Sequence, residues 1–420
     1  MARSDVVITG IGCISPLGVS PDEMSAALRE GRSAIGEIAG FDASGYPCQF
    51  GAEVLNLELS DFVESSKTYI DRTSAYVLAA CSSALEEAHW GGDESVGLIL
   101  GTAWGCMDSL QLFAEKLVSG NPRFVPPLPF THSYTNAPNS LAAIEFKLRG
   151  FNACLANGHV AGASAIEYAC RRIALGKEKR LLAGGGESLS ESVFHAYGLR
   201  GGLSASGQPR PYDPASDGMV LGEGAAVFAL EDAELAREWS DPVFARVLGW
   251  ASCTAAIPSA SLSAGPAASE GQSAVRRTSG TGQEGSLADG IARAMHKALA
   301  DAGIAPDAVD LILGAACGLP ELDSAEAEAI RSVFGSALPA VTSIKGMVGE
   351  GMGSGGPMSL AAALACLEGH FAPPVSAGGP PALEGLNLIT GAARDLRVHT
   401  AIVNAVDPGG ACVCLVVAAP

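Results

Sequence analysis

Short apolar runs alternate with amphipathic helical patterns along nearly the whole chain, and this alternation limits the fold more than any other feature. We expect strands within residues 6–9, 96–100, 180–183, 225–230, 243–248, 311–313, 401–403 and 412–417. Helical patterns lie between many of them, at residues 21–30, 69–88, 162–175, 286–302, 324–334 and 357–368. Such an order predicts an α/β fold with largely parallel sheets covered by helices.

The length of 420 residues and the hydrophobic content of 48% allow a large core or two joined units. A small-residue helix entered through a Gly-rich turn occurs at 161–175 and again at 354–368. We therefore predict two similar halves, residues 1–235 and 236–420. Residues 253–286 are rich in Ser, Gly and Ala, which predicts a long flexible loop early in the second half.

The formal net charge is −19, and the 26 Lys and Arg residues form no basic cluster. This composition argues against nucleic acid and anionic membranes as partners. The chain opens directly on a predicted strand, and no apolar run reaches the roughly 20 residues of a membrane span, so we expect a cytoplasmic protein. Eleven Cys residues without CxxC pairs indicate reduced thiols and no zinc site.

The stretch RGFNACLANGHVAGASAIEYAC at 149–170 predicts a strand, a sharp Asn157-Gly158 turn and a buried helix. Nucleophiles often stand at such an elbow, because the N–H groups at a helix N-terminus stabilise developing negative charge. Here the tip carries an imidazole, His159. Its side chain either performs chemistry or fills the place of a catalyst. We expect Cys154, inside the preceding strand, to lie in the core.

Five blocks of the sequence resemble β-ketoacyl synthases of the thiolase fold, in the right order and across nearly the whole chain. They are VVITGIGCISPLG at 6–18, LLAGGGES at 181–188, RPYDPASDGMVLGEGAAVFALE at 210–231, SIKGMVGEGMGSGG at 343–356 and VNAVDPGGACVCLVV at 403–417. Ser216 replaces the Arg that is usual in the third block. The resemblance implies two similar βαβ halves that form a five-layered α-β-α-β-α structure.

The departures from the family pattern concern the residues that carry the chemistry. Condensing synthases use an acylated Cys and two His that stabilise anionic intermediates. By the resemblance, those three positions hold His159, Ala315 and Glu350, and only the Lys is retained, as Lys345. We expect Lys345 to keep a structural ion pair, and His159 and Glu350 to face each other across the pocket within hydrogen-bonding reach. Cys317 lies on the loop of the first lost His and is expected to be buried rather than nucleophilic.

The gate loop of the family also differs. Its Phe-containing motif is replaced by Asp407, Pro408, Gly409 and Gly410, with no aromatic residue. The same losses are typical of the chain length factor, or KSβ, branch of type II polyketide synthases. This chain resembles that branch also in GLPELDSAEAEAIRSVFG at 318–335 and GGPMSLAAALACLEGHFAPPV at 355–375. Members of the branch usually carry Gln where this chain carries His159.

The resemblance implies a pseudoenzyme subunit that pairs as a heterodimer with a Cys-His-His ketosynthase and shapes the tunnel for the polyketide chain. It implies no cofactor of the chain's own. The phosphopantetheine arm of an acyl carrier protein is expected to enter through the partner. One alternative is a stand-alone enzyme with a remodelled His159/Glu350 site, such as a decarboxylase, a hydrolase or a non-Cys acyltransferase. Another is a purely structural or regulatory protein of the same fold.

Apolar residues recur at helical spacing after the GTAWGC stretch, namely Met107, Leu110, Phe113 and Leu117. Such a stripe most often packs in a core or a dimer interface. By the resemblance, this region meets the partner subunit and lines the end of the tunnel. Phe113 is the bulkiest of the four, so it is our candidate for the wall that ends chain growth.

Several acidic residues could be mistaken for catalytic groups. We expect Asp213, Asp217 and Glu223 to hold Gly-rich turns by accepting backbone N–H groups. Asp323 and Glu326 are expected to tie the loop of the first lost His to the start of a helix. Glu326 is otherwise interpreted as an ordinary helical surface residue.

Overall fold

The computed structural model of the chain describes residues 3–65, 67–91, 93–255, 285–376 and 385–420. Its main sheet has eleven strands in the order β12-β10-β9-β14-β15-β8-β1-β7-β6-β4-β5. The strands of the first half are β1 (Val6–Ile14), β4 (Gly97–Gly101), β5 (Asn152–Leu155), β6 (Arg180–Glu187) and β7 (Gly224–Asp232). Those of the second half are β8 (Ala245–Thr254), β9 (Leu311–Leu313), β10 (Ala340–Thr342), β12 (Asn387–Leu388), β14 (Thr400–Val406) and β15 (Ala411–Ala418).

The two halves repeat one topology. The first has the strand order β5-β4-β6-β7-β1 and the second the corresponding order β10-β9-β14-β15-β8. An antiparallel pairing of β1 with β8, in which Val6 lies opposite Val247, joins them into one sheet. The predicted halves are therefore present, while the boundary at 235/236 stays a prediction and falls inside helix α8 (Ala233–Trp239).

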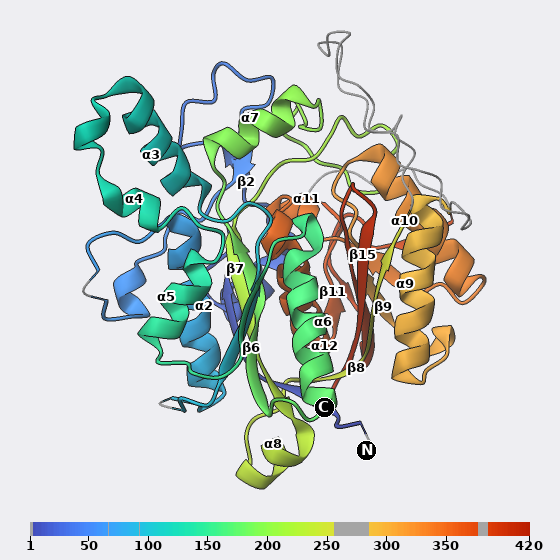
Figure 1. Ribbon diagram of the computed structural model, residues 1–420. Coiled ribbons are helices and arrows are strands. Elements are labelled where there is room, and N and C mark those ends of the chain that lie inside the picture. Colours follow the sequence, from blue (N-terminus) through green and yellow to red (C-terminus); the bar gives the residue numbers. More distant parts are fainter. Residues whose placement is uncertain (1–2, 66, 92, 256–284, 377–384) are drawn as a thin grey trace.

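Five layers are visible in Figure 1. Helices cover the outer face of each half of the sheet, and two more helices lie between the halves. The outer helices are α2 (Arg72–Glu87) and α5 (Ala137–Glu145) on one side, and α9 (Leu287–Ala302) and α10 (Pro320–Phe334) on the other; the inner pair is α6 (Ala161–Ala174) and α12 (Gly355–Gly369). This arrangement confirms the predicted five-layered fold. The largest cluster of buried apolar residues lies around α6 and α12.

The expectation of largely parallel sheets was wrong, because the sheet is mixed. β4 runs parallel to β5 and β6, and β9 runs parallel to β10 and β14. β7 pairs antiparallel with β1 and β6, and β15 pairs antiparallel with β8 and β14. Helical crossovers return the chain in the parallel sense, whereas β14 and β15 are joined by a short turn and form a hairpin. Apolar periodicity reports burial and does not distinguish these two directions.

Local sequence signals explain several helix boundaries. α1 (Pro21–Glu30) begins after Ser20, whose side chain accepts the Glu23 N–H, and it ends at Gly31 with a φ of 69°. α9 begins with a capping box in which Ser286 and Asp289 satisfy each other's backbone N–H groups. Of the predicted loop at 253–286, residues 256–284 lie outside the described part of the chain.

The remaining elements are short or lie at the upper edge of the molecule in Figure 1. They are α3 (Met107–Ser119), α4 (Pro127–Thr131), α7 (Glu191–Leu199), α11 (Lys345–Val348), β2 (Ile35–Glu37), β3 (Phe50–Ala52), β11 (Phe371–Ala372), β13 (Arg394–Asp395), and the 3-10 turns η1 (Leu59–Asp61), η2 (Pro122–Phe124), η3 (Gly158–Val160), η5 (Pro306–Ala308) and η6 (Met352–Ser354). Within the described ranges, no helix is both long enough and apolar enough to cross a membrane.

Candidate functional site

The elbow between β5 and α6 has the predicted strand–turn–helix form. Gly158 adopts a φ of +74°, which L side chains rarely adopt, and His159 lies in the 3-10 turn that precedes α6. A Cβ added to Gly158 would come within 2.2 Å of Asp407 Oδ2, so any larger residue would collide with that carboxylate. The turn of the elbow and the loop that carries Asp407 are therefore fitted to each other.

The imidazole of His159 is held on both sides. Its side chain is only 6% exposed. Nε2 lies 2.6 Å from the hydroxyl of Tyr197 on α7, and Nδ1 lies 3.5 Å from Glu350 Oε1. Burial raises the pKa of Tyr197, so the phenol keeps its proton and can donate it to Nε2. Nδ1–H then points toward the carboxylate, and one imidazole proton is enough to satisfy both contacts.

Glu350 and Lys345 form a buried ion pair with 2.6 Å between Oε2 and Nζ. Burial alone would raise the pKa of Glu350, but the Lys345 charge and the His159 contact outweigh it and lower this pKa to about 2. Burial opposes the charge of Lys345 as well, yet Glu350 raises the pKa of the ammonium group. Lys345 also donates to the Ala315 carbonyl at 2.9 Å. The predicted structural ion pair of Lys345 is confirmed.

The backbone N–H of the elbow is already occupied by an anion of the chain itself. His159 N donates to Asp407 Oδ2 at 2.9 Å, and Gly409 N donates to Asp407 Oδ1 at 2.6 Å. Pro408, between Asp407 and Gly409 in the sequence, has no backbone N–H. An elbow N–H that could stabilise an acyl oxyanion therefore contacts a carboxylate instead. The sequence pointed to this loop only through its missing aromatic residue, and the contact with His159 was not predicted.

The loop of the first lost His is fixed by two acidic residues of α10. Glu326 accepts the N–H groups of Ala315 and Ala316, and Asp323 accepts those of Cys317 and Gly318, at 2.8 to 2.9 Å. The predicted tie between this loop and the helix is confirmed.

Glu326, however, is not the surface residue that we expected. It is fully buried. Its carboxylate also accepts from the Tyr212 hydroxyl at 2.8 Å and from the Asn404 amide at 3.0 Å, and these two partners come from other parts of the chain. Cys317 is buried too, and burial raises its pKa well above the usual thiol range, so it is no nucleophile at neutral pH.

The other acidic residues accept backbone N–H groups as predicted, although Glu223 joins separate segments and does not hold a Gly-rich turn. Asp213 accepts the N–H of Ala215, and Asp217 accepts that of Ser206. Glu223 accepts the N–H groups of two separate segments, at Val54 and Leu189, and pairs with Arg72 at 2.6 Å. The expectation that Cys154 lies in the core was wrong. It is half-buried, because β5 is the last strand of the sheet and has a neighbour on one side only.

The predicted stripe on α3 divides into two parts. Met107, at the start of the helix, packs against the apolar cluster that contains Met352, and Tyr197, the partner of His159, packs against the same cluster. Farther along, Leu110 and Leu117 are 40% and 41% exposed, and Phe113 is half-buried. The only fully buried residue of α3 is Ser109. The outer part of the stripe is thus an exposed surface and not a core contact within this chain.

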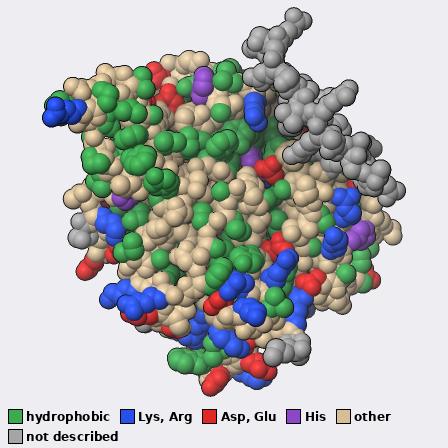
Figure 2. Space-filling model, viewed as in Figure 1, with side chains coloured by type: hydrophobic (Ala, Val, Ile, Leu, Met, Phe, Trp, Pro, Cys, Tyr) green, Lys and Arg blue, Asp and Glu red, His purple; other side chains and the backbone are tan. Residues whose placement is uncertain are grey.

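This exposed surface continues onto α4. The Phe113 ring packs on Phe130 with 5.0 Å between centroids, and Phe130 contacts Tyr134 at 5.6 Å. We call the set of apolar side chains that α3, η2, α4 and the following turn expose the α3–α4 apolar surface: Leu110, Leu112, Phe113, Leu117, Val118, Phe124, Leu128, Phe130 and Tyr134. Figure 2 shows apolar side chains gathered over these helices, at the upper left. Contiguous apolar patches of this kind usually mark an interaction site.

A second unpaired feature lies at the end of the sheet. β5 pairs with β4 on one side, and in the sheet order of the described residues no strand lies on its other side. An open edge strand is a ready template for a strand of another chain. The elbow follows β5 directly, so this edge and the candidate site are neighbours.

The polar groups of the site are engaged mainly with one another. Its elbow has no thiol, its one imidazole is bound at both nitrogens, and its backbone N–H is occupied. Lys345 and Glu350 neutralise each other. Of the predicted residues, the structure brings together His159, Ala315, Glu350, Lys345 and Asp407; Tyr197 completes the group and was missed, because nothing in the sequence around α7 distinguishes it.

The comparisons with known proteins agree with this geometry. The model of the β-ketoacyl synthase N-terminal domain matches residues 3–236, and that of the C-terminal domain matches residues 271–378. The tetracenomycin polyketide synthase ketoacyl synthase beta subunit of Streptomyces glaucescens is 31% identical over 421 residues, which cover 97% of each chain. The 3-oxoacyl-[acyl-carrier-protein] synthase 2 of Coxiella burnetii is 28% identical over 428 residues, which cover 98% of this chain and 97% of that protein.

Among solved structures, the ishigamide ketosynthase/chain length factor superposes with a TM-score of 0.87 at 25% identity, and the match covers 100% of both chains. The fold, the ordered sequence blocks and these matches lead to one conclusion. The chain belongs to the β-ketoacyl synthase family.

Proposed function

We propose that this chain is a chain length factor-type subunit without condensing activity of its own. It pairs in the cytoplasm with a Cys-His-His ketosynthase and shapes the tunnel in which a polyketide chain grows. One observation carries the proposal: the elbow that would hold the nucleophile is closed by the chain's own residues. His159 lies between Tyr197 and Glu350, and Asp407 occupies the N–H of the elbow.

Three positions of the site lack the groups that condensation needs. Condensation needs a thiolate that accepts the acyl group, and imidazoles or N–H groups that stabilise the anions formed afterwards. His159 offers no sulfur, and Ala315 offers no polar side chain. Glu350 is a carboxylate that is already paired with Lys345. With a pKa of about 2 it is ionised at neutral pH, so it has no proton to donate to an enolate or an oxyanion.

The two unpaired surfaces support a partner subunit. The open edge of β5 leads into the elbow, and Cys154 of β5 contacts the carbonyl of Thr135, the residue that follows Tyr134 of the α3–α4 apolar surface. A second chain that pairs with β5 and covers α3 would bury both at once. Relatives support the same choice: one is named as the beta subunit of a polyketide ketosynthase, and one similar structure is a ketosynthase/chain length factor.

The proposed position of the tunnel is based on where α3 begins and ends. Met107 lies in the apolar cluster beside Tyr197, whereas Leu110, Phe113 and Leu117 lead away from it toward the exposed surface. A growing chain that enters from the partner's active site would meet these side chains at the interface. The phosphopantetheine arm of the carrier protein enters through the partner, and this chain needs no cofactor. Elongation stops where packed bulk blocks further growth.

The test is reconstitution. Three preparations are made: the chain alone, the chain together with its co-expressed ketosynthase, and the ketosynthase alone. Each preparation receives malonyl-loaded carrier protein. The proposal predicts a 1:1 complex by light scattering and long products only from that complex. Equal products from the ketosynthase alone would contradict it.

A second function is favoured by one observation, the contact of His159 with both Glu350 and Tyr197. Such a group could serve as an acid or base in a stand-alone decarboxylase, hydrolase or acyltransferase. The chain alone, incubated with malonyl- and acyl-thioesters, would then release carbon dioxide or free acid. Glu350→Gln would abolish that activity. We expect no turnover above the protein-free background.

A further inference from the structure

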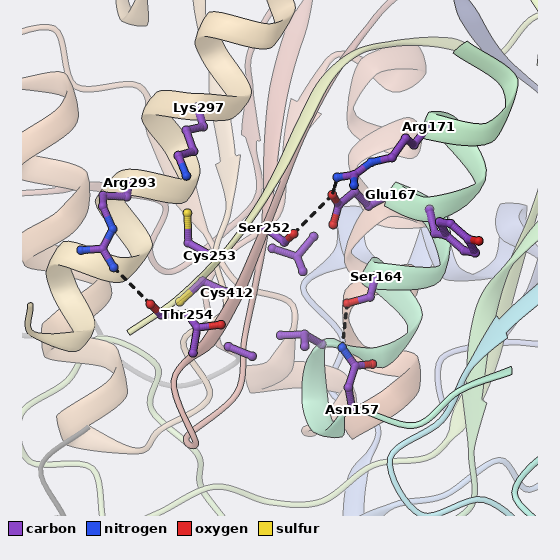
Figure 3. A pocket seen from close by; sticks show the side chains of 14 residues that line it. Asn157, Ser164, Glu167, Arg171, Ser252, Cys253, Thr254, Arg293, Lys297 and Cys412 are labelled. Atoms are coloured by element: carbon purple, nitrogen blue, oxygen red, sulfur yellow. Dashed lines mark hydrogen bonds and ion pairs between the residues drawn. The ribbon is translucent and has the colours of Figure 1, made fainter. Parts of the chain in front are cut away.

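A cavity of about 590 Å³ opens between α6 and α9, across the ends of β8 and β15 (Figure 3). Its lining includes Asn157 and Val160, on either side of His159 in the elbow, and two further lining residues are cysteines, Cys253 on β8 and Cys412 on β15. All eleven cysteines of the chain are free thiols. Nine of them are buried, and Cys253 and Cys154 are the two that are partly exposed.

The strand register places these two cysteines directly opposite each other. In the antiparallel pair of β8 and β15, Cys412 is the partner of Cys253, between the pairs Ala411–Thr254 and Val413–Ser252. Opposed residues in such a ladder have Cα atoms about 4.5 to 5.5 Å apart and side chains on the same face. A disulfide needs a Cα separation of about 4.4 to 6.8 Å. The backbone geometry therefore already suits a cross-strand disulfide.

The two thiols differ in their exposure and in their neighbours. Cys253 is partly exposed toward the cavity, whereas Cys412 is only 2% exposed and its Sγ contacts the Gly410 carbonyl at 3.6 Å. Arg293 and Lys297, one turn apart on α9, form the wall nearest to the sulfur atoms in Figure 3. Arg293 Nη2 also donates to the Thr254 carbonyl at 3.2 Å, beside Cys253. On the opposite wall, Arg171 is paired with Glu167. The part of the cavity wall that lies beside Cys253 is therefore cationic.

We propose that Cys253 and Cys412 form a reversible disulfide when the chain meets a mild oxidant such as a peroxide. The Cys253 thiolate attacks one peroxide oxygen, and the O–O bond breaks. Cys253 becomes a sulfenic acid, and the released hydroxide takes up a proton to give water. The Cys412 sulfur then displaces the sulfenic oxygen as a second water and closes the S–S bond. Two thiols and one hydrogen peroxide thus give one disulfide and two waters, and a dithiol reductant reverses the change.

The position of this bond connects it to the elbow. β15 begins one residue after the Asp407–Gly410 turn, and Ala255 N donates to the Gly410 carbonyl at 2.8 Å. A disulfide between Cys253 and Cys412 would fix the end of β8 to the strand that follows this turn. The same turn carries the carboxylate that occupies the elbow N–H. Oxidation is therefore expected to hold Asp407 in place.

The test uses the folded full-length chain. It is treated with a stepwise excess of hydrogen peroxide, quenched, alkylated after unfolding and analysed by intact mass and peptide mapping. We expect a product that has lost two hydrogens, in which a peptide with Cys253 is joined to one with Cys412. Dithiothreitol should restore the original mass. Cys253→Ser and Cys412→Ser should each abolish the crosslink, whereas Cys154→Ser, which removes the other partly exposed thiol, should leave it intact.

Three results would overturn the proposal. The first is that both thiols stay fully alkylatable at peroxide concentrations that oxidise Cys154. The second is that Cys253 proceeds to a stable sulfinic acid while Cys412 stays free. The third is a link from Cys253 to Cys414, the buried cysteine two residues along β15. Each of these would show that the register of the strands does not bring the two sulfurs into bonding range.

Discussion

The elbow of α6 and the α3–α4 apolar surface differ in how their side chains are satisfied. At the elbow, the polar groups have partners within the chain: His159 contacts Tyr197 and Glu350, and the His159 N–H contacts Asp407. On the α3–α4 apolar surface, large apolar side chains are exposed, with Val118 at 87%. Polar groups that already have partners gain little from a new hydrogen bond to a ligand. Covering an exposed apolar surface with another chain, in contrast, lowers the free energy of the system. This difference is the basis of our proposal that the chain has lost condensing chemistry and kept an interface.

The largest effect should come from breaking the closed network at its ion pair. Lys345→Met removes the cation and leaves Glu350 charged and buried, which we expect to cost about 3–5 kcal/mol of the free energy of unfolding. Denaturant unfolding monitored by circular dichroism measures this loss. The matched control is Arg149→Met, whose partner Glu94 lies at the surface, where the loss should stay below about 1 kcal/mol. Equal losses for both variants would show that the network is not closed.

The same ion pair predicts a pH dependence. Folding lowers the pKa of Glu350 from 4.5 to about 2, so its contribution is fully present above pH 4.5 and disappears as the pH falls toward 2. The shift corresponds to about 3 kcal/mol. Unfolding free energies measured between pH 6 and pH 2.5 should therefore decline more steeply for the natural chain than for Glu350→Gln. Parallel curves would contradict this assignment.

A smaller effect is expected at the interface. Phe130→Asp places a charge in the middle of the α3–α4 apolar surface, beside Phe113 and Tyr134. Because buried aromatic residues often dominate binding, the Kd of the heterodimer should rise roughly thirtyfold, or about 2 kcal/mol. Light scattering across a dilution series would measure it.

The control for this substitution is Leu175→Asp, at an apolar residue that is also exposed but lies at the far end of α6. It should leave the Kd unchanged. If the two substitutions weaken the heterodimer equally, the α3–α4 apolar surface has no special part in pairing.

Phe113→Ala sharpens the comparison further, because it should change the product and not the assembly. Removing the ring opens space beside Phe130 that a growing chain can occupy. We expect the product distribution to move toward longer chains by at least one extension unit, as measured by mass spectrometry of products from the intact complex. Phe371→Ala, a truncation in the core at β11, should lower stability without lengthening products. Unchanged lengths for Phe113→Ala would move the wall to Met107 or Leu110.

The smallest effect is predicted at the elbow itself. His159→Gln keeps a polar side chain between Tyr197 and Glu350, so the turnover of the complex should stay within about threefold of that of the natural chain. Single-turnover kinetics of the reconstituted heterodimer would measure it. A hundredfold loss, about 2.7 kcal/mol of barrier, in an intact complex would assign His159 a chemical role.

Much of the fold could be predicted from local signals. Ser20, Pro21 and Gly31 bound α1 through capping and backbone rules that depend on a few adjacent residues. The contact of His159 with Glu350 followed from the family resemblance, which places the two positions opposite each other. Strand direction could not be predicted in this way, because a buried run has the same composition in a parallel or an antiparallel pair.

The residues that close the site were harder to predict. Tyr197 reaches His159 from α7, and Asp407 reaches it from the β14–β15 turn, 248 residues along the chain. Such contacts depend on tertiary packing and leave no periodic pattern in the sequence. The burial of Glu326 was missed for the same reason, since Tyr212 and Asn404 are distant along the chain.

The most direct test of the central claim is to locate the acyl group in the assembled heterodimer. The complex is incubated with acyl-loaded carrier protein, and the intact mass of each subunit is measured. Our account predicts one acyl group on the partner's cysteine and none on this chain, including its His159→Cys variant, because Asp407 still occupies the elbow N–H and Pro408 supplies none. A stable acyl adduct on the natural chain would contradict the account.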